Sequence, residues 1–169
     1  MGLEKKKHVS LPEIVRTCVG TVLGIGGVAL LAEYTNLPFI IAPFGASAVL
    51  IYSAVSSPLA QPRNLIFGHL VSGAIAITVC NLMGNSVAAT VLAVTAAIVA
   101  MMLLNVVHPP GGATALLCML QNTTSYTFLL TPIATGCAVL LLSAIIASKI
   151  VPGVIPYPAN QNSSKKSNE

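Results

Sequence analysis

Long apolar stretches separated by short polar turns occupy most of the chain. Apolar residues dominate positions 13–34, 37–56, 65–83, 86–104 and 127–149. A helix needs about 20 apolar residues to cross the hydrocarbon of a bilayer, and these stretches reach or approach that length. The pattern therefore predicts an all-α protein, a polytopic transmembrane helix bundle.

A related sequence motif occurs twice, once within the apolar stretch 37–56 and once after the stretch 86–104. Residues 43–50 read PFGASAVL, and residues 110–117, which lie 67 positions further on, read PGGATALL. Proline and glycine disfavour a helix interior, so each phrase predicts a break followed by a short helix. We expect these half-helices at 46–55 and 113–121.

The placement of the two phrases predicts an internal repeat. Units of three segments at about 13–83 and 86–149 each carry one broken helix, and an odd number of crossings turns the second unit upside down. We expect six crossings, because an extended piece followed by a half-helix is long enough to span the bilayer. The resulting inverted-topology repeat is typical of secondary transporters. The alternative is four spans with two re-entrant half-helices.

Composition supports a membrane protein and argues against nucleic-acid binding. Hydrophobic residues make up 55% and charged residues 7% of the chain, and the mean hydropathy is +0.87. Soluble domains carry about 25% charged residues. The net charge of +4 lies largely in the two tails, and aromatic residues are only 5%, too few for base stacking along a nucleic acid.

The tails and charges predict domain limits and orientation. We expect a basic N-terminal tail at 1–11, a transmembrane domain at 12–150 and a disordered, Pro- and Ser-rich tail at 151–169. Positive residues favour the cytoplasmic side, so both termini are expected in the cytoplasm. The protein is expected in the inner membrane of a bacterium, or in a chloroplast envelope if it is eukaryotic.

The starts of the half-helices are the candidate binding site. A helix start has unpaired backbone N–H groups and a partial positive charge, and small residues let an anion approach them. The candidate substrate-binding residues are therefore those at the two starts: Gly45, Ala46, Ser47, Gly112, Ala113 and Thr114. Valine at either glycine is expected to abolish flux. Close helix packing is the alternative reason for the small residues.

Four further polar residues interrupt apolar surroundings. His108 is a candidate for anion binding or proton transfer, although it could equally cap the preceding helix. Arg63, Asn64 and His69 are candidates for gating or for attracting anions. For Arg63, an anchoring role at the membrane interface is the alternative.

Three stretches together resemble the HPP family of small integral membrane proteins. They are residues 108–115 (HPPGGATA), residues 42–48 (APFGASA) and residues 58–64 (PLAQPRN) with the Gly68-His69 pair. Gly111 stands where the family motif often has alanine. The resemblance covers about residues 12–150, and because family members are implicated in nitrite transport it implies a nitrite carrier.

The leading hypothesis is a transporter for a small monovalent anion, with nitrite preferred and coupled protons as an option. A passive anion channel and a non-transporting assembly or sensor subunit are the alternatives. We do not expect the protein to be an enzyme, because no stretch of its sequence resembles a nucleophile elbow. The four cysteines are far apart, so neither a metal site nor a cofactor is expected. The partners are the lipid bilayer and the anion, and a homo-oligomer fits the small-residue faces.

Overall fold

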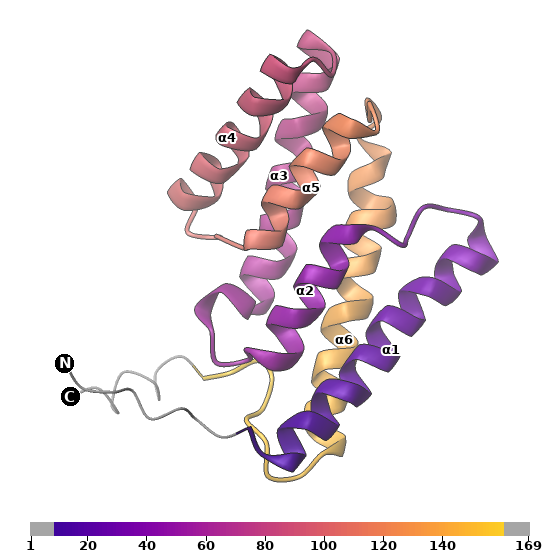
Figure 1. Cartoon of the computed structure of the whole chain (residues 1–169), viewed down its shortest axis with the longest axis vertical. Helices are drawn as coiled ribbons and strands as arrows, with labels where there is room; N and C mark the ends of the chain where they lie inside the picture. Colours follow the sequence, from indigo (N-terminus) through magenta and orange to yellow (C-terminus); the bar gives the residue numbers. More distant parts are fainter. Residues whose placement is uncertain (1–8, 161–169) are drawn as a thin grey trace, which may run out of the picture.

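The computed structural model describes residues 9–160, and within that range every secondary-structure element is a helix or a helical turn (Figure 1). The elements in chain order are α1 (Leu11–Thr35), α2 (Ala42–Ser53), the 3₁₀ turn η1 (Pro58–Ala60), α3 (Pro62–Met83), α4 (Val87–Leu103), α5 (Pro109–Leu120), the π-helical turn η2 (Leu129–Ala134) and α6 (Thr135–Ile150). The all-helical prediction is confirmed.

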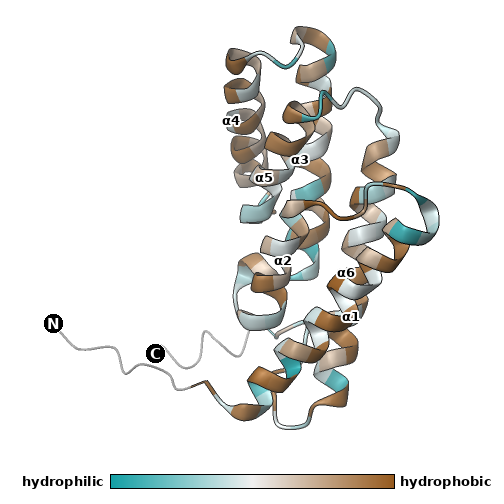
Figure 2. Ribbon diagram, turned by 45° about the vertical axis from the view of Figure 1, so that its right-hand side comes forward, coloured by the Kyte–Doolittle hydropathy of each residue, from teal (hydrophilic) through white to brown (hydrophobic). Residues whose placement is uncertain are grey.

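Three helices of the described residues are long and apolar enough to cross a membrane. They are α1, α3 and the η2–α6 segment Leu129–Ile150, which is kinked at Thr131. The other helices, α2, α4 and α5, are apolar but shorter. Large side chains such as Val22, Leu82 and Val87 are 71%, 79% and 83% exposed. Hydrophobic residues occur along the length of the helices (Figure 2), and the exposed ones make a surface that suits lipid rather than water. The number of crossings stays a prediction.

Local sequence explains where the helices begin. Ser10 and Glu13 form a reciprocal capping box at the start of α1, which satisfies two of the donors that a helix start leaves open. The half-helices have no such side-chain cap. Both begin about four residues before the expected positions, at Ala42 and Pro109, with their prolines inside the first turn. Proline is tolerated there because its missing N–H has no partner within the helix.

The core consists of two parts with different packing. Bulky side chains from α1, α2 and α6 fill one part, including Phe44, Ile51, Tyr52 and Leu140. Small side chains join α3, α4 and α5 in the other, where Ala76, Ala89, Ala93, Ala97 and Ala115 are all 0% exposed. Small residues bring helix backbones close together, so α3, α4 and α5 form a tight group.

Gly24→Ala is expected to destabilise the first part of the core by about 1–3 kcal/mol. A Cβ at Gly24 would collide with the Tyr52 hydroxyl, which is hydrogen-bonded to Ser143 at 2.6 Å. Gly26→Ala is the matched control on the same helix, since nothing lies within 4 Å of a Cβ there. The measurement is the folded fraction that remains after heating in detergent; equal loss in both variants would contradict the prediction.

The segment after α6 differs from the predicted disordered tail. Residues 151–160 fold back onto the bundle, with Val151 and Tyr157 only 7% and 3% exposed. The prediction of disorder is therefore wrong for 151–160, because polar contacts given below hold this segment. Residues 161–169, like residues 1–8, lie outside the described part.

Candidate functional site

The two half-helices begin close to one another in the middle of the molecule. From there α2 and α5 run in opposite directions along the long axis (Figure 1), and the two helices contact each other. Helix α3 passes beside this meeting point and packs along α5. The junction therefore gathers side chains from three helices that are distant in the sequence.

Four polar side chains meet at this junction, and we refer to Ser47, His69, His108 and Thr114 as the histidine cluster. Each of the four is 0% exposed. Ser47 Oγ lies 2.8 Å from His69 Nε2 and 2.9 Å from His108 Nε2. One hydroxyl of α2 thus joins a histidine of α3 to the histidine that precedes α5.

The outer nitrogen of each imidazole also has a partner. His69 Nδ1 lies 2.6 Å from Thr114 Oγ1 on α5. His108 Nδ1 lies 2.8 Å from the carbonyl oxygen of Leu59 in η1. All four ring nitrogens are hydrogen-bonded, which offsets the cost of burying these groups in an apolar bundle.

Tight packing encloses the histidine cluster. The Phe44 ring meets the His69 ring edge to face, with centroids 5.6 Å apart, and the two imidazoles are 5.0 Å apart. A Cβ at Gly68 would lie 2.5 Å from His108 Cβ, and one at Gly111 would lie 2.7 Å from the Gly68 carbonyl oxygen. These two glycines let α3 approach the start of α5 closely enough for the hydrogen bonds to form.

The backbone at the start of α5 does not offer the free donors that the sequence predicted. Pro109 and Pro110 have no N–H, and the Gly111 amide donates to the His108 carbonyl oxygen at 2.8 Å. At the start of α2 the Phe44 amide donates to Ile41 O at 3.0 Å. The expectation of several open amides was therefore wrong at α5, and side chains supply the polar groups of the junction.

The remaining candidates from the half-helix starts point away from the histidine cluster. Gly45, Ala46 and Ala113 are exposed and Gly112 is partly exposed. A Cβ at Gly45 or Gly112 would meet nothing within 4 Å. Helical periodicity explains the split, because Ser47 and Thr114 lie about 200° around the helix from these glycines. The structure therefore gives no steric reason for valine at either glycine to block flux.

Arg63 and Asn64 lie outside the histidine cluster, at the start of α3. Arg63 is exposed and donates to the Leu104 carbonyl oxygen at 3.0 Å. Asn64 donates to the Val107 carbonyl oxygen at 2.8 Å. Both residues hold the loop between α4 and α5, so they position the backbone that carries His108.

Sequence reasoning missed the contacts that support η1. The Tyr157 hydroxyl donates to the Ala60 carbonyl oxygen at 2.7 Å, next to the Leu59 carbonyl that accepts from His108. Burial raises the pKa of Tyr157, so the hydroxyl keeps the proton that it donates. Gln61 Oε1 accepts from the Ala159 amide at 3.1 Å. The C-terminal segment is thereby tied to the loop that orients His108.

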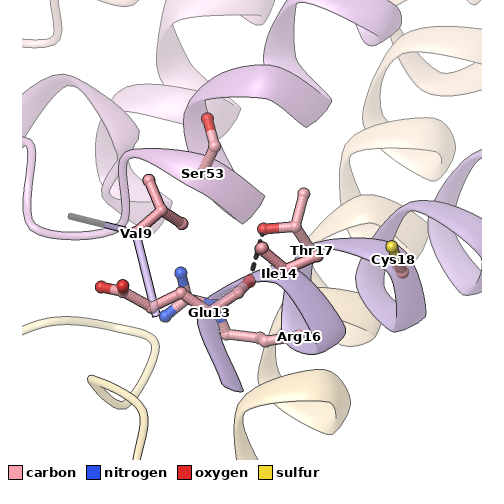
Figure 3. A pocket seen from close by; sticks show the side chains of 7 residues that line it. All are labelled: Val9, Glu13, Ile14, Arg16, Thr17, Cys18 and Ser53. Carbon is pink, nitrogen blue, oxygen red and sulfur yellow. Dashed lines mark hydrogen bonds between the residues drawn. The ribbon is translucent and has the colours of Figure 1, made fainter. Parts of the chain in front are cut away.

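A second set of polar contacts lies at the start of α1. Arg16 is 3% exposed and donates to the carbonyl oxygens of Tyr52 at 3.1 Å and Ile155 at 3.4 Å. A cavity of about 350 Å³ adjoins it, lined by Val9, Glu13, Ile14, Arg16, Thr17, Cys18 and Ser53 (Figure 3). None of the histidine cluster lines this cavity. Arg16 thus joins α1 to α2 and the C-terminal segment.

Tyr157→Phe is expected to lower stability by about 1–2 kcal/mol, because the buried Ala60 carbonyl loses its donor. Tyr34→Phe provides the control, since Tyr34 is 82% exposed. Melting of both variants in detergent tests this. A Tyr157→Phe protein as stable as the control would show that the hydrogen bond from Tyr157 to Ala60 contributes nothing to stability.

Similarity to known proteins agrees with this architecture. The family model for the HPP transmembrane region matches residues 6–158 of the chain. Two proteins of Dictyostelium discoideum, each named only as a transmembrane protein, are 36% identical over 158 and 162 residues. These alignments cover 87% and 88% of this chain but 51% and 57% of the relatives, so the chain spans little more than half their length. No solved structure matches. The chain belongs to the HPP family and is a transmembrane protein.

Proposed function

We propose that this protein transports a small monovalent anion, with nitrite as the substrate, and that the histidine cluster lies on the transport pathway. The observation that carries the proposal is the burial of four polar side chains where two half-helices begin, inside an otherwise apolar bundle. Polar groups are costly within a membrane and commonly mark the route of a substrate or ion.

The chemistry of the junction favours an anion over a cation. Hydroxyl and imidazole groups can donate hydrogen bonds, and no Asp or Glu occurs in α2, α3 or α5. The carboxylates that a metal cation or an ammonium group would need are thus missing from the helices that form the site. The starts of α2 and α5 add the positive ends of two helix dipoles.

Helix packing supports the inverted repeat that we propose for the fold. Helix α1 packs against α6, and α4 packs correspondingly against α3. Ser47 and Thr114 occupy matching positions of the two repeated phrases, and both contact His69. An inverted pair of broken helices around a central site is the arrangement of many secondary transporters.

The closed state of the histidine cluster favours a carrier over an open channel. All four side chains are fully buried and hydrogen-bonded to one another or to nearby carbonyls. An anion therefore reaches them only after helices move, as in alternating access.

Uptake into liposomes tests the proposal. Purified protein is reconstituted, and nitrite entry is compared with that in protein-free vesicles and in vesicles that contain heat-denatured protein. We expect uptake that saturates with nitrite concentration. Correctly inserted, folded protein that gives no uptake above both controls would overturn the proposal. Uptake that does not saturate would indicate a channel instead of a carrier.

The orientation proposed for the bundle places both termini in the cytoplasm, because Arg16 and Lys149 lie at the ends of α1 and α6 that adjoin them. We also propose that the chain crosses the membrane six times and that this membrane is the inner membrane of a bacterium. A membrane-impermeant maleimide applied to intact cells should leave a cysteine at position 9 unlabelled and label one at position 85. The reverse pattern would refute the orientation.

A further inference from the structure

The hydrogen bonds of the histidine cluster have a defined direction. A carbonyl oxygen only accepts, so His108 Nδ1 must carry the proton that it shares with Leu59 O at 2.8 Å. In neutral His108 the other nitrogen, Nε2, is then an acceptor, and the Ser47 hydroxyl donates to it at 2.9 Å. Ser47 Oγ consequently accepts from His69 Nε2 at 2.8 Å. Leu59 therefore determines the tautomers of both histidines.

The other end of this chain of hydrogen bonds has two possible states. With its proton on Nε2, neutral His69 accepts at Nδ1 from the Thr114 hydroxyl at 2.6 Å. A second acceptor for the same hydroxyl, the Pro110 carbonyl oxygen, lies at 3.3 Å. Threonine in a helix commonly donates to the carbonyl four residues earlier. The Thr114 hydroxyl can therefore turn from His69 to Pro110 by rotation of a single proton.

We propose that the histidine cluster is a binding site for one proton, that His69 Nδ1 is the atom that takes it, and that the proton crosses the membrane together with the anion. On protonation a new N–H bond forms at Nδ1 and donates to Thr114 Oγ1, while the Thr114 hydroxyl turns to Pro110 O. Every donor keeps an acceptor in both states. This inference rests on the proposed function, because it names the ion that accompanies the substrate.

His108 is not equivalent to His69. A proton added at His108 Nε2 would face Ser47 Oγ, which would then accept from both imidazoles and keep a hydroxyl proton with no acceptor. Within residues 9–160, the partners of Ser47 Oγ are the two histidines. An unsatisfied buried donor is costly, so the proton binds to His69, because the Thr114 hydroxyl can turn to Pro110 O.

The surroundings of His69 explain why the anion and the proton bind together. The elements that contact α3, the helix of His69, are α4, α5, α6, η1 and η2, and α2 is joined to His69 through Ser47. None of these elements contains a carboxylate. Their titratable side chains besides His108 are Tyr52, Cys118, Cys137 and Lys149, and none of these hydrogen-bonds to His69. A buried imidazolium without a counter-ion is strongly disfavoured. A monovalent anion beside it gives a neutral pair, so transport carries no net charge.

Nitrogen NMR of ¹⁵N-histidine-labelled protein in nanodiscs tests the proton site without relying on transport. The chain has three histidines, and His8→Gln leaves the signals of the two in the cluster. With saturating nitrite, acidification from about pH 8 to about pH 4 should convert His69 to the doubly protonated form while His108 keeps its Nδ1-protonated, neutral form. Protonation of His108 before His69, or of neither ring, would overturn the proposal.

Two substitutions at Thr114 distinguish a loss of the proton acceptor from a general loss of stability. Thr114→Val has almost the same shape but no hydroxyl, so protonated His69 Nδ1 loses its acceptor and proton affinity should fall at least tenfold, a change worth about 1.4 kcal/mol. Thr114→Ser keeps the hydroxyl and should retain proton binding. Equal proton affinity in the two variants, both checked for folding by gel filtration, would refute the role of Thr114.

Flux measurements test the coupling itself. An inward proton gradient should drive nitrite uptake into proteoliposomes, and a potassium diffusion potential set with valinomycin should leave the rate unchanged. Uptake that follows the membrane potential would disprove neutral co-transport while the proposed function stands. Titration of His69 without nitrite uptake would disprove the proposed function and the co-transport together.

Discussion

Gly111→Ala is expected to destabilise the packing of α3 against α5 in this chain, even though the family motif often has alanine at that position. A Cβ at Gly111 would lie 2.7 Å from Gly68 O, 3.0 Å from Gly68 C and 3.0 Å from Met101 Sδ. Two of these atoms belong to the backbone of α3, so relief requires α3 and α5 to move apart. Overpacking of this kind costs about 1–3 kcal/mol, and the separation would also weaken the hydrogen bond between His69 and Thr114.

Gly112→Ala is the matched control for Gly111→Ala. The two glycines are adjacent in the first turns of α5, yet a Cβ at Gly112 meets nothing within 4 Å. Alanine is a better helix former than glycine by roughly 0.5–1 kcal/mol, so this variant should be as stable as the parent or slightly more stable. The comparison is the monodisperse fraction after heating in detergent. Indistinguishable melting of the two variants would refute the close contact between α3 and α5.

Ser47→Ala is expected to abolish most transport, with nitrite uptake reduced at least tenfold. Ser47 is the only described side chain that bonds to both His69 and His108. Its loss leaves the His69 Nε2 donor and the His108 Nε2 acceptor without a partner, at a cost of about 1–3 kcal/mol for each buried group. The histidine cluster is then divided into two halves that no longer set each other's tautomers.

Ser53→Ala makes the same chemical change at the end of the same helix. Ser53 is exposed and donates to the Val49 carbonyl oxygen, so its loss should leave uptake unchanged. Uptake is normalised to the amount of folded protein in the vesicles, which separates lost transport from lost stability. Undiminished uptake by Ser47→Ala would show that the histidine cluster does not lie on the transport pathway.

The sequence identified the residues of the candidate site better than it identified the contacts. Ser47 and Thr114 followed from the repeated phrase, and His69 and His108 from their apolar surroundings. Their mutual hydrogen bonds join residues that are 22, 45 and 61 positions apart. Pattern within a single helix contains no information about such partners, so the cluster itself could not be predicted.

The role of the glycines shows the same limit. Sequence reasoning chose Gly45 and Gly112 because they stand at matching places in the two phrases, but both face open space. The glycines that the fold needs for close approach are Gly68 and Gly111. Periodicity states which residues share a face of a helix, but not which face meets another backbone.

By itself, the sequence determined that this chain is an all-helical membrane protein with two broken segments, because hydropathy over about 20 residues and the backbone limits of proline are local properties. Only the tertiary structure decided that the half-helices begin at Ala42 and Pro109, that the start of α5 lacks the open amides expected from the sequence, and that two histidines share Ser47. It also placed Tyr157 and Arg16 against carbonyls of distant segments. These features depend on which surfaces meet when the helices pack, and that is a property of the whole chain.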